Sequence, residues 1–549
     1  MSSAPSRDNQ LTFREAAQSI LLFSLMVIVF KHQSRLGMSI FDEGSVVGGA
    51  MLVGDGMIPY RDFSSLYGPG QYYLTAAIFY VLGETLSSAR ILHALLLAIL
   101  GITIFSLPGQ KSSKRSLVLL LVYVGIVLFA QPNVGYPAIT ATIFLLSGAL
   151  PLLEWSRAGR MSSLLLASSL VGIAGLFRWD FGFFGLVAIT SATAIAMIDE
   201  RGKSTRAIPA LPCLVGALTP AMLILAAVYL PLLVMFSDPN RWYEEVMIYS
   251  IREFPKWRNS EFVRPTYQGL LWALSEGSSA LHVEKAVLRM AYLALPILLV
   301  VGSLGTAVRI LLRKRAVHPE GGSLLLIVYL TFLCMLLLNQ MRVRPTLWQG
   351  FPAMVVALPL MAILSFHYRE PIARSGRVTT ALGVIGFVLS AMLFNVAFQG
   401  VLESSNQKLI ELDTPRSSGV YIKPEMAPYI DLVRYVRDNT RSGDAIYSGV
   451  QDHSRLVIND AMLYFLTDRR PADRFLALEP GISNTRSGQE EIIGALERNN
   501  VRLIVLGDFP SDEPNQTSES NGVTALDQFI HANYRIVRRI GGRVVMVRN

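Results

Sequence analysis

The stretch that decides the fold runs from Phe41 to Leu74 and reads FDEGSVVGGAMLVGDGMIPYRDFSSLYGPGQYYL. It opens with two adjacent carboxylates, Asp42 and Glu43, in a chain that is 52% hydrophobic and only 16% charged. A soluble domain of ordinary composition carries about 25% charged residues. We therefore interpret the stretch as a polar loop between membrane-spanning helices.

Apolar runs suited to spanning a membrane recur on both sides of this loop. Eleven are predicted as spans, at 16–30, 88–108, 116–130, 134–153, 162–177, 181–198, 207–236, 287–312, 323–340, 346–366 and 377–399. Residues 72–82 are apolar but too few to cross about 30 Å, so we expect a short helix at the membrane interface. A cleaved signal peptide is the alternative for the first run, but no small-residue cleavage site follows it.

The loop charges predict the orientation of these spans. With the N-terminus inside, the inner loops fall at 109–116, 154–162, 199–206, 313–322 and 367–377, and they are rich in Lys and Arg. The short outer links contain few basic residues, which is the positive-inside pattern. The predicted topology therefore has a first outer loop at 31–87, a second large outer loop at 237–286, and the C-terminal region outside.

The composition changes near residue 400. Residues 401–549 hold 20 acidic and 18 basic residues, which leaves 20 acidic and 31 basic residues in the first 400. The excess of basic residues in the front part suits inner loops and anionic lipids, and does not indicate nucleic acid. We predict a membrane domain at 1–400 and a soluble α/β domain at 401–549, because helix and strand patterns alternate there. Its predicted elements are helices at 426–439, 458–466 and 490–498, strands at 445–448 and 501–507, and a hairpin at 534–547.

Charged residues gather in the outer segments, beside the ends of spans. They are Asp42, Glu43, Arg90, Arg178, Asp180, Arg342 and Arg344. Acids beside arginines at a water–lipid boundary suit a substrate with a phosphate head and a lipid tail. Arginine pairs bidentately with phosphate, and a carboxylate can take a proton from an attacking hydroxyl. We predict that Arg178, Arg342 and Arg344 contact a donor phosphate; the alternative is that such arginines only anchor the helices to lipid headgroups.

The remaining candidate residues lie in or near the first outer loop. The Tyr67-Gly68-Pro69-Gly70 segment predicts a sharp turn, which would fold the loop back and wall a substrate cavity. The plainer alternative is a turn followed by an aromatic belt at the interface. The predicted substrate-binding residues are Glu43, Arg61, Tyr67, Gln71, Tyr72, Arg90 and Asp180.

The sequence shows no pattern that requires a cofactor. We find no His-x-Glu or Cys-x-x-Cys spacing for zinc and no phosphate-binding Gly-Lys-Ser/Thr loop. The two cysteines, Cys213 and Cys334, lie in apolar segments, which makes a disulfide framework improbable. A divalent metal could sit between Asp42 and Asp180, but nothing in the sequence requires one.

The order of features in residues 38–95 resembles the GT-C glycosyltransferases. An outer loop opens with Asp-Glu, continues with PYRDF and YGPGQYYLTAAIFYVLG, and leads into a span that begins near Arg90. The resemblance is to the bacterial branch related to the protein O-mannosyltransferases and the lipid A aminoarabinose transferase. It is specific over this loop and loose over the other spans. It implies a multi-pass protein of the bacterial inner membrane, a polyprenyl-phosphate sugar donor, transfer at the outer face, and Asp42 as general base.

One departure from the mannosyltransferases bears on the substrate. Their His-Pro-Pro or Lys-Pro-Pro type of turn is replaced here by Tyr67-Gly68-Pro69-Gly70. The resemblance therefore names neither the donor sugar nor the acceptor, which could be a glycan, a lipid or a protein.

The sequence is compatible with three functions. The leading one is transfer of a sugar to an acceptor hydroxyl, and inversion is expected because the sequence offers one base and no neighbouring carboxylate nucleophile. The alternative is a transporter or flippase of lipid-linked sugars, but such folds often show internal repeats and polar residues at mid-membrane, and neither is seen here. The third is a binding or assembly protein whose soluble domain does the work. Replacing Asp42 by Asn would separate an enzyme from a scaffold.

Overall fold

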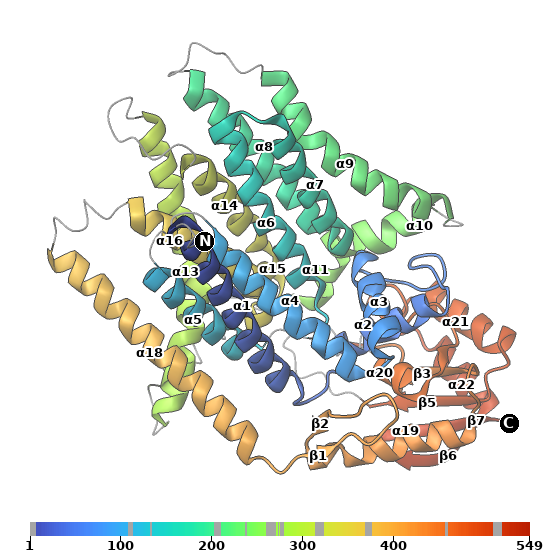
Figure 1. Cartoon of the computed structure of the whole chain (residues 1–549). Helices are drawn as coiled ribbons and strands as arrows, with labels where there is room; N and C mark the ends of the chain where they lie inside the picture. The colour runs from blue at the N-terminus through green and yellow to red at the C-terminus, as the bar shows by residue number, and fades with distance from the viewer. Residues whose placement is uncertain are drawn as a thin grey trace, which may run out of the picture.

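The computed structural model describes residues 7–107, 113–131, 134–201, 210–235, 239–259, 271–272, 274, 279–312, 323–367, 376–455, 459–508 and 519–549. Most of the predicted basic inner loops, and residues 260–270 of the second outer loop, lie outside this set. A bundle of helices forms the larger part, and a domain containing a β-sheet sits at one end of it (Figure 1).

A helix is present at each of the eleven predicted spans. They are α1 (Arg7–Ser34), α4 (Leu86–Ser106), α5 (Ser113–Ala130), α6 (Pro137–Ala158), α7 (Met161–Phe177), α8 (Trp179–Arg201), α9 (Ala210–Met235), α13 (Ala280–Leu312), α14 (Ser323–Leu337), α16 (Leu347–His367) and α18 (Gly376–Asn406). Within the described residues, nine helices are long and apolar enough to cross a membrane, and Leu117–Ala130 and Met161–Phe177 are shorter apolar helices. The predicted fold class of a polytopic helical membrane protein is confirmed.

Buried tyrosine hydroxyls in the bundle donate hydrogen bonds to backbone carbonyls of neighbouring helices. The Tyr123 hydroxyl donates to the carbonyl of Leu97 (2.7 Å), and the Tyr329 hydroxyl donates to the carbonyl of Leu145 (2.8 Å). Such bonds between helices satisfy groups that lipid cannot solvate. Large apolar side chains cover the outside of the bundle, as a lipid-facing surface requires.

The first outer loop contains two short helices, α2 (Asp42–Gly54) and α3 (Gly70–Leu82). The second matches the short helix expected at 72–82. The α2 segment is helical although it contains several glycines. These glycines are required because neighbouring segments pack closely against the helix. A Cβ on Gly44 would come within 2.4 Å of the Met462 backbone nitrogen, and a Cβ on Gly49 within 2.5 Å of the Tyr72 ring.

The second outer loop is also largely helical where it is described. It contains α10 (Pro239–Trp242), the π-helical segment η1 (Tyr243–Glu253) and α11 (Phe254–Arg258). A further short helix, α15 (Asn339–Val343), forms the tight link between α14 and α16. The η1 segment lies against the C-terminal domain, because Glu245 of η1 pairs with Arg474.

The C-terminal region is the predicted α/β domain. Its elements are β1 (Ile410–Glu411), β2 (Tyr421–Ile422), the 3-10 turn η2 (Pro424–Met426), α19 (Ala427–Asn439), β3 (Ala445–Val450), α20 (Met462–Thr467), β4 (Arg470–Pro471), α21 (Arg486–Arg498), β5 (Leu503–Gly507), α22 (Ala525–Asn533), β6 (Tyr534–Ile540) and β7 (Arg543–Arg548). The five-stranded sheet has the order β4-β3-β5-β7-β6, with β4, β3 and β5 parallel and the final hairpin antiparallel. The helix predicted from 458 begins instead at Met462, where Asp460 Oδ1 accepts from the Leu463 N–H (3.1 Å).

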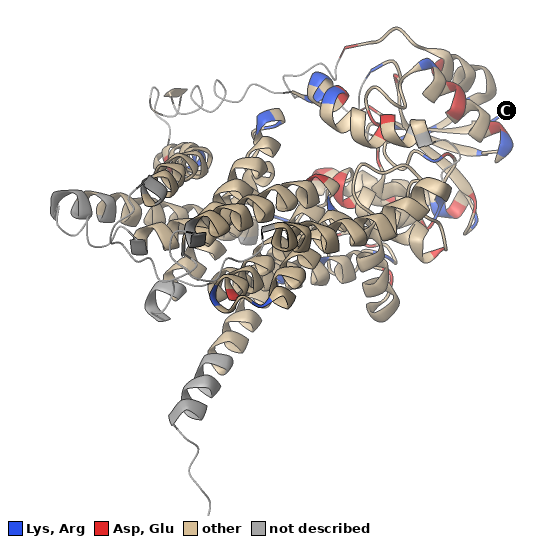
Figure 2. Cartoon of the chain, turned by 90° about the horizontal axis from the view of Figure 1, so that it is seen from above, with Lys and Arg blue, Asp and Glu red and all other residues tan. Residues whose placement is uncertain are grey.

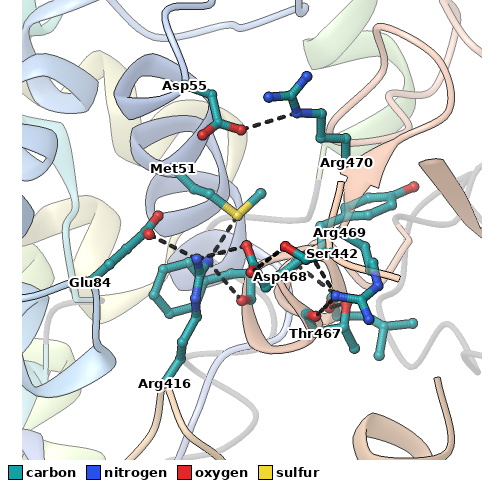
Figure 3. A network of polar contacts seen from close by, with 12 residues as sticks. Met51, Asp55, Glu84, Arg416, Ser442, Thr467, Asp468, Arg469 and Arg470 are labelled. Atoms are coloured by element: carbon teal, nitrogen blue, oxygen red, sulfur yellow. Dashed lines mark hydrogen bonds and ion pairs between the residues drawn. The ribbon is translucent and has the colours of Figure 1, made fainter. Parts of the chain in front are cut away.

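Ion pairs join this domain to the first outer loop (Figure 3). Arg416 Nη2 lies 2.8 Å from Glu84 Oε2 and 2.8 Å from Asp468 Oδ1, and Arg470 Nε lies 3.1 Å from Asp55 Oδ2. Among the residues that the structure describes, charged residues gather in this domain and at its junction with the bundle (Figure 2).

Backbone and apolar contacts add to this junction. The Gly37 N–H donates to the Tyr421 carbonyl (2.8 Å), and the Tyr421 N–H donates to the Arg35 carbonyl (2.9 Å). One hydrophobic cluster includes Val47 and Leu52 of α2 together with Phe465 of α20. The outer loop and the C-terminal domain therefore form one packed unit above the bundle.

Candidate active site

Asp42 lies at the start of α2 and lines a cleft between the two outer loops and the C-terminal domain. Its backbone N–H donates to Ser39 Oγ (3.2 Å), which fixes the first turn of the helix. The cleft encloses about 850 Å³, counted out to its open mouth. Its walls come from the first outer loop, from η1, and from residues 474–482 of the C-terminal domain.

Two arginines oppose the effect of burial on Asp42. Burial raises the pKa of this carboxyl, while the positive charges of Arg344 and Arg258 lower it, and the pKa remains above its ordinary value. A carboxylate with a raised pKa is a stronger base than one in water. Arg344 is one of the site residues predicted from the sequence. It directly follows α15, and from this position its charge acts on Asp42.

A second carboxylate, Glu479, lines the same cleft. Its Oε2 accepts a hydrogen bond from the Tyr249 hydroxyl (3.0 Å). Burial raises its pKa, Arg258 lowers it, and the negative charge of Asp42 raises it further. The single base predicted from the sequence thus shares its cleft with a second carboxylate. Sequence reasoning missed Glu479 because more than 400 residues separate the two acids.

Arg258 is the other residue that the predicted site lacked. Its side chain is only 5% exposed, and its Nε has no hydrogen-bond partner among the described residues. Its charge acts on Asp42, on Glu479 and on Arg344. A buried guanidinium with an unused N–H, beside a second arginine, is suited to an anionic ligand. Its place in a loop with several basic residues was the only signal in the sequence.

Arg178 and Asp180 form a closed network at the edge of the site. Arg178 Nε and Nη2 lie 3.0 and 2.7 Å from the two carboxylate oxygens of Asp180, and Gln340 Nε2 lies 2.7 Å from Oδ2. The guanidinium also lies over the Tyr67 ring, with Cζ 5.7 Å from its centroid. The structure thus places Arg178 and Asp180 at the edge of the site, where their opposite charges neutralise each other.

This network does not favour the suggested metal site between Asp42 and Asp180. Both oxygens of Asp180 already accept hydrogen bonds from Arg178 and Gln340. Within the described part of the chain, no group of three His, Cys, Asp or Glu side chains is placed to hold a metal ion. We therefore derive no step through a metal.

Glu43, predicted to bind substrate, forms an ion pair with Arg90. Both partners are buried, with 2% and 3% exposure. Arg90 also donates to the backbone carbonyls of Ser34 (2.6 Å) and Gly37 (2.9 Å). These contacts fix α2 to the C-terminal end of α1 and to the N-terminal part of α4. They give Glu43 and Arg90 a structural role that the prediction of substrate contact did not include.

Arg61, Gln71 and Arg342 likewise have partners in the protein. Arg61 is partly exposed and pairs with Asp62 (2.7 Å). The buried Gln71 accepts a hydrogen bond from Thr140 (3.0 Å) and joins α3 to α6. Arg342 is exposed, and its Nε donates to the Asn339 side chain (3.0 Å).

Tyr67 and Tyr72 do line the cleft. The Tyr72 hydroxyl shares a hydrogen bond with Ser65 Oγ (2.7 Å), and the Tyr67 carbonyl accepts from the Tyr60 hydroxyl. Burial raises the pKa of Tyr72 to about 12, so its hydroxyl stays protonated at neutral pH. Both rings stand beside the space that Asp42 faces. Of the predicted residues, the structure thus brings together Asp42, Arg344, Tyr67, Tyr72 and, at the edge, Arg178.

No protein-family model matches the chain, and no curated protein matches its sequence. The Archaeoglobus fulgidus oligosaccharyltransferase in complex with zinc and sulfate superposes with a TM-score of 0.47 at 13% identity, covering 85% of this chain and 64% of that chain. AglB from the same organism, with an inhibitory peptide and a dolichol-phosphate, gives 0.47 at 12% identity, covering 90% and 70%. ArnT from Cupriavidus metallidurans, bound to undecaprenyl phosphate, gives 0.43 at 13% identity, covering 96% and 97%.

AglB and ArnT belong to the GT-C superfamily, which the first outer loop resembles. The chain spans 64% of the length of the first archaeal structure and nearly all of ArnT. Because the TM-scores lie below 0.5, these likenesses carry no argument about activity, and the function is argued below from the residues of this chain.

Proposed function

We propose that this chain is a membrane glycosyltransferase of the GT-C type. It moves a sugar from a polyprenyl-phosphate donor to an acceptor hydroxyl at the outer face of a bacterial inner membrane. The observation that carries the proposal is Asp42, a buried carboxylate in a cleft beside the membrane helices, next to the arginine pair Arg344 and Arg258.

The reaction assigns a separate task to each charge. The acceptor oxygen forms a bond to the anomeric carbon while the bond from that carbon to the phosphate oxygen breaks. The proton of the acceptor hydroxyl passes to Asp42, and the sugar's former partner leaves as polyprenyl phosphate. General base catalysis of this kind contributes about 10²–10⁴ in rate.

Arg344 and Arg258 stabilise the departing phosphate. Negative charge grows on the phosphate oxygen as the bond breaks, and fixed cations placed nearby stabilise that charge most in the transition state. Arg178 has a different task in this scheme. Paired with Asp180 and lying over Tyr67, it holds one wall of the cleft in position.

The sugar should change its anomeric configuration in a single displacement. Retention would need a carboxylate nucleophile, and Glu479 is the candidate for that role among the described residues. Comparing donor and product by NMR distinguishes the two outcomes. An inverted product supports the assignment of Asp42 as a base in one step.

The test of the proposal is turnover by purified protein. Polyprenyl-phosphate sugars extracted from membranes containing the chain serve as donor, and mass spectrometry follows the release of polyprenyl phosphate. Asp42→Asn should lower the turnover number by about 10²–10⁴. Asp62→Asn is the matched control, since Asp62 lies in the same loop and pairs with the partly exposed Arg61.

Binding is measured alongside turnover, with undecaprenyl phosphate as the probe. Asp42→Asn should bind it about as well as the wild type, because the arginines are intact. Full turnover by Asp42→Asn would contradict the role of Asp42. No release of polyprenyl phosphate by the wild type would contradict the enzyme itself.

A further inference from the structure

A segment of the C-terminal domain, residues 472–485, reaches from β4 to α21 and forms one wall of the Asp42 cleft. Arg474 fixes it in place. Its guanidinium lies 2.7 Å from Glu245 of η1 and 2.8 Å from Glu491 of α21. Its carbonyl accepts from the Ser64 N–H of the first outer loop (2.8 Å). The segment is therefore bound to both outer loops and to its own domain.

Glu479 lies on this fixed segment and lines the cleft together with Asp42. Among the described residues its side chain makes one hydrogen bond, through Oε2 with Tyr249. The other oxygen, Oε1, thus keeps its capacity to accept. Burying a carboxylate is costly unless its oxygens find donors, so a carboxylate with unused capacity inside a cleft is suited to a ligand hydroxyl.

The chemistry of the cleft indicates which kind of ligand would fit. Aromatic rings, serine hydroxyls and three acids line it, as follows: Phe41, Tyr60, Tyr67, Tyr72, Trp242, Phe475; Ser45, Ser64, Ser65; Asp42, Glu245, Glu479. Among the described residues that line the cleft, Arg474 is the only cation, and it is paired with Glu245 and Glu491. An anionic ligand would be repelled here, whereas sugar rings can pack on aromatic faces and give hydroxyl protons to carboxylates.

The phosphate-binding arginines are not among the residues that line this cleft. Arg344 and Arg258 act on both acids, yet neither is part of the lining. The two acids are therefore influenced by two cations that lie outside the lining, while the space that the acids line is anionic and bordered by aromatic rings. In the proposed reaction the leaving phosphate belongs with the cations, and the acceptor belongs in the cleft.

We propose that Glu479 binds the acceptor, and that the acceptor is an uncharged carbohydrate. Glu479 accepts a hydrogen bond from one sugar hydroxyl and so presents a neighbouring hydroxyl to Asp42. The C-terminal domain thereby selects the acceptor. This inference rests on the glycosyltransferase function proposed above and adds the acceptor class and its binding residue.

The experiment separates use of the acceptor from use of the donor. Purified full-length protein receives the extracted polyprenyl-phosphate sugars, first with water as the only acceptor. A protein-free glycan fraction, a protein fraction or a lipid fraction of the same cell envelope is then added. Release of polyprenyl phosphate is measured in each case, as is binding of undecaprenyl phosphate.

Glu479→Ala should raise the glycan concentration needed for half-maximal stimulation by about 10-fold or more, the value expected for losing a hydrogen bond to a charged group. Undecaprenyl phosphate binding should be unchanged, which also shows that the variant is folded. Glu479→Asp should recover part of the glycan response. The matched control is Glu490→Ala, because Glu490 is an exposed acid of the same domain that pairs with Arg486.

Three outcomes would overturn the inference. One is an unaltered half-saturating glycan concentration in Glu479→Ala. Another is stimulation by the protein or lipid fraction in place of the glycan fraction. The third is loss of release to water in Glu479→Ala with intact undecaprenyl phosphate binding, which would make Glu479 a nucleophile. A wild type that releases no polyprenyl phosphate under any condition would instead refute the enzyme function on which the inference rests.

Discussion

The carboxylate of Glu43 meets the guanidinium of Arg90 at two points, Nε to Oε1 and Nη2 to Oε2, both at 2.8 Å. Glu43 directly follows Asp42 in the sequence, yet these two acids have different roles. One holds α2 against α1 and α4, and the other faces the cleft.

The first prediction concerns the stability of this pair. Glu43→Gln should lower the free energy of unfolding by about 3–5 kcal/mol, because it leaves a buried guanidinium without its counter-charge. Thermal unfolding of the detergent-solubilised protein measures the loss. Glu154→Gln is the control, since its partner Arg160 is 68% exposed and such surface pairs contribute about 0–1 kcal/mol. Equal stability of the two variants would contradict a structural role for Glu43.

The second prediction separates two arginines that are two residues apart. Arg344→Ala should weaken undecaprenyl phosphate binding by about 10- to 150-fold, since charge-assisted hydrogen bonds contribute about 1.5–3 kcal/mol. Arg342→Ala should change it little, because Arg342 is exposed and bonded to Asn339. Titration of each purified variant with this lipid gives the comparison. A larger loss in Arg342→Ala would move the phosphate site outward.

The third prediction concerns pH. Asp42 acts as a base only when ionised, so kcat/KM should fall as the pH drops through its raised pKa. Arg344 lowers that pKa, and removing its charge in Arg344→Ala should raise it further. The acid limb of the profile should therefore move to higher pH in this variant. A limb that stays in place, or moves to lower pH, would show that another group controls it.

The same measurement needs a control that shows whether the acid limb belongs to Asp42 or to Glu479. Its pKa is also raised by burial, and the charges of Arg258 and Arg344 act on it as well. The acid limb should persist in Glu479→Gln if it belongs to Asp42. Its disappearance in that variant would assign it to Glu479.

The fourth prediction tests the orientation in the membrane. The native cysteines, Cys213 and Cys334, are both buried, and are first replaced by Ala. In that background, Glu497→Cys in α21 should react with a membrane-impermeant maleimide added to intact spheroplasts. Ala158→Cys at the end of α6 should react only after permeabilisation. Labelling of both positions from the same side would contradict the predicted topology.

The sequence predicted the helices of the bundle well because membrane spans are encoded locally, in composition and loop charge. It left the conformation of α2 open for the opposite reason. Glycine disfavours helix when only local preferences count. In the folded protein, Gly44 and Gly49 are needed for the close approach of Met462 and Tyr72. Long-range packing decided what local propensity could not.

The residues of the candidate site likewise fall into those that the sequence predicted and those that only the folded structure reveals. Asp42 and Arg344 were found because both lie beside the ends of spans, where charged residues are uncommon. Glu479 and Arg258 belong to segments whose composition is unremarkable, and only the folded chain brings them to Asp42. The ion pair of Glu43 with Arg90 could not be read from the sequence either, because Arg90 is 47 residues away.

The close fit of Gly44 against Met462 joins two segments that are synthesised at different times. During synthesis, α2 leaves the ribosome more than 400 residues before the segment that carries Met462 and Glu479. Until that segment folds, the glycine-rich face of α2 is uncovered and the cleft lacks a wall. The cleft around Asp42 is therefore complete only when the C-terminal domain has folded and packed against α2.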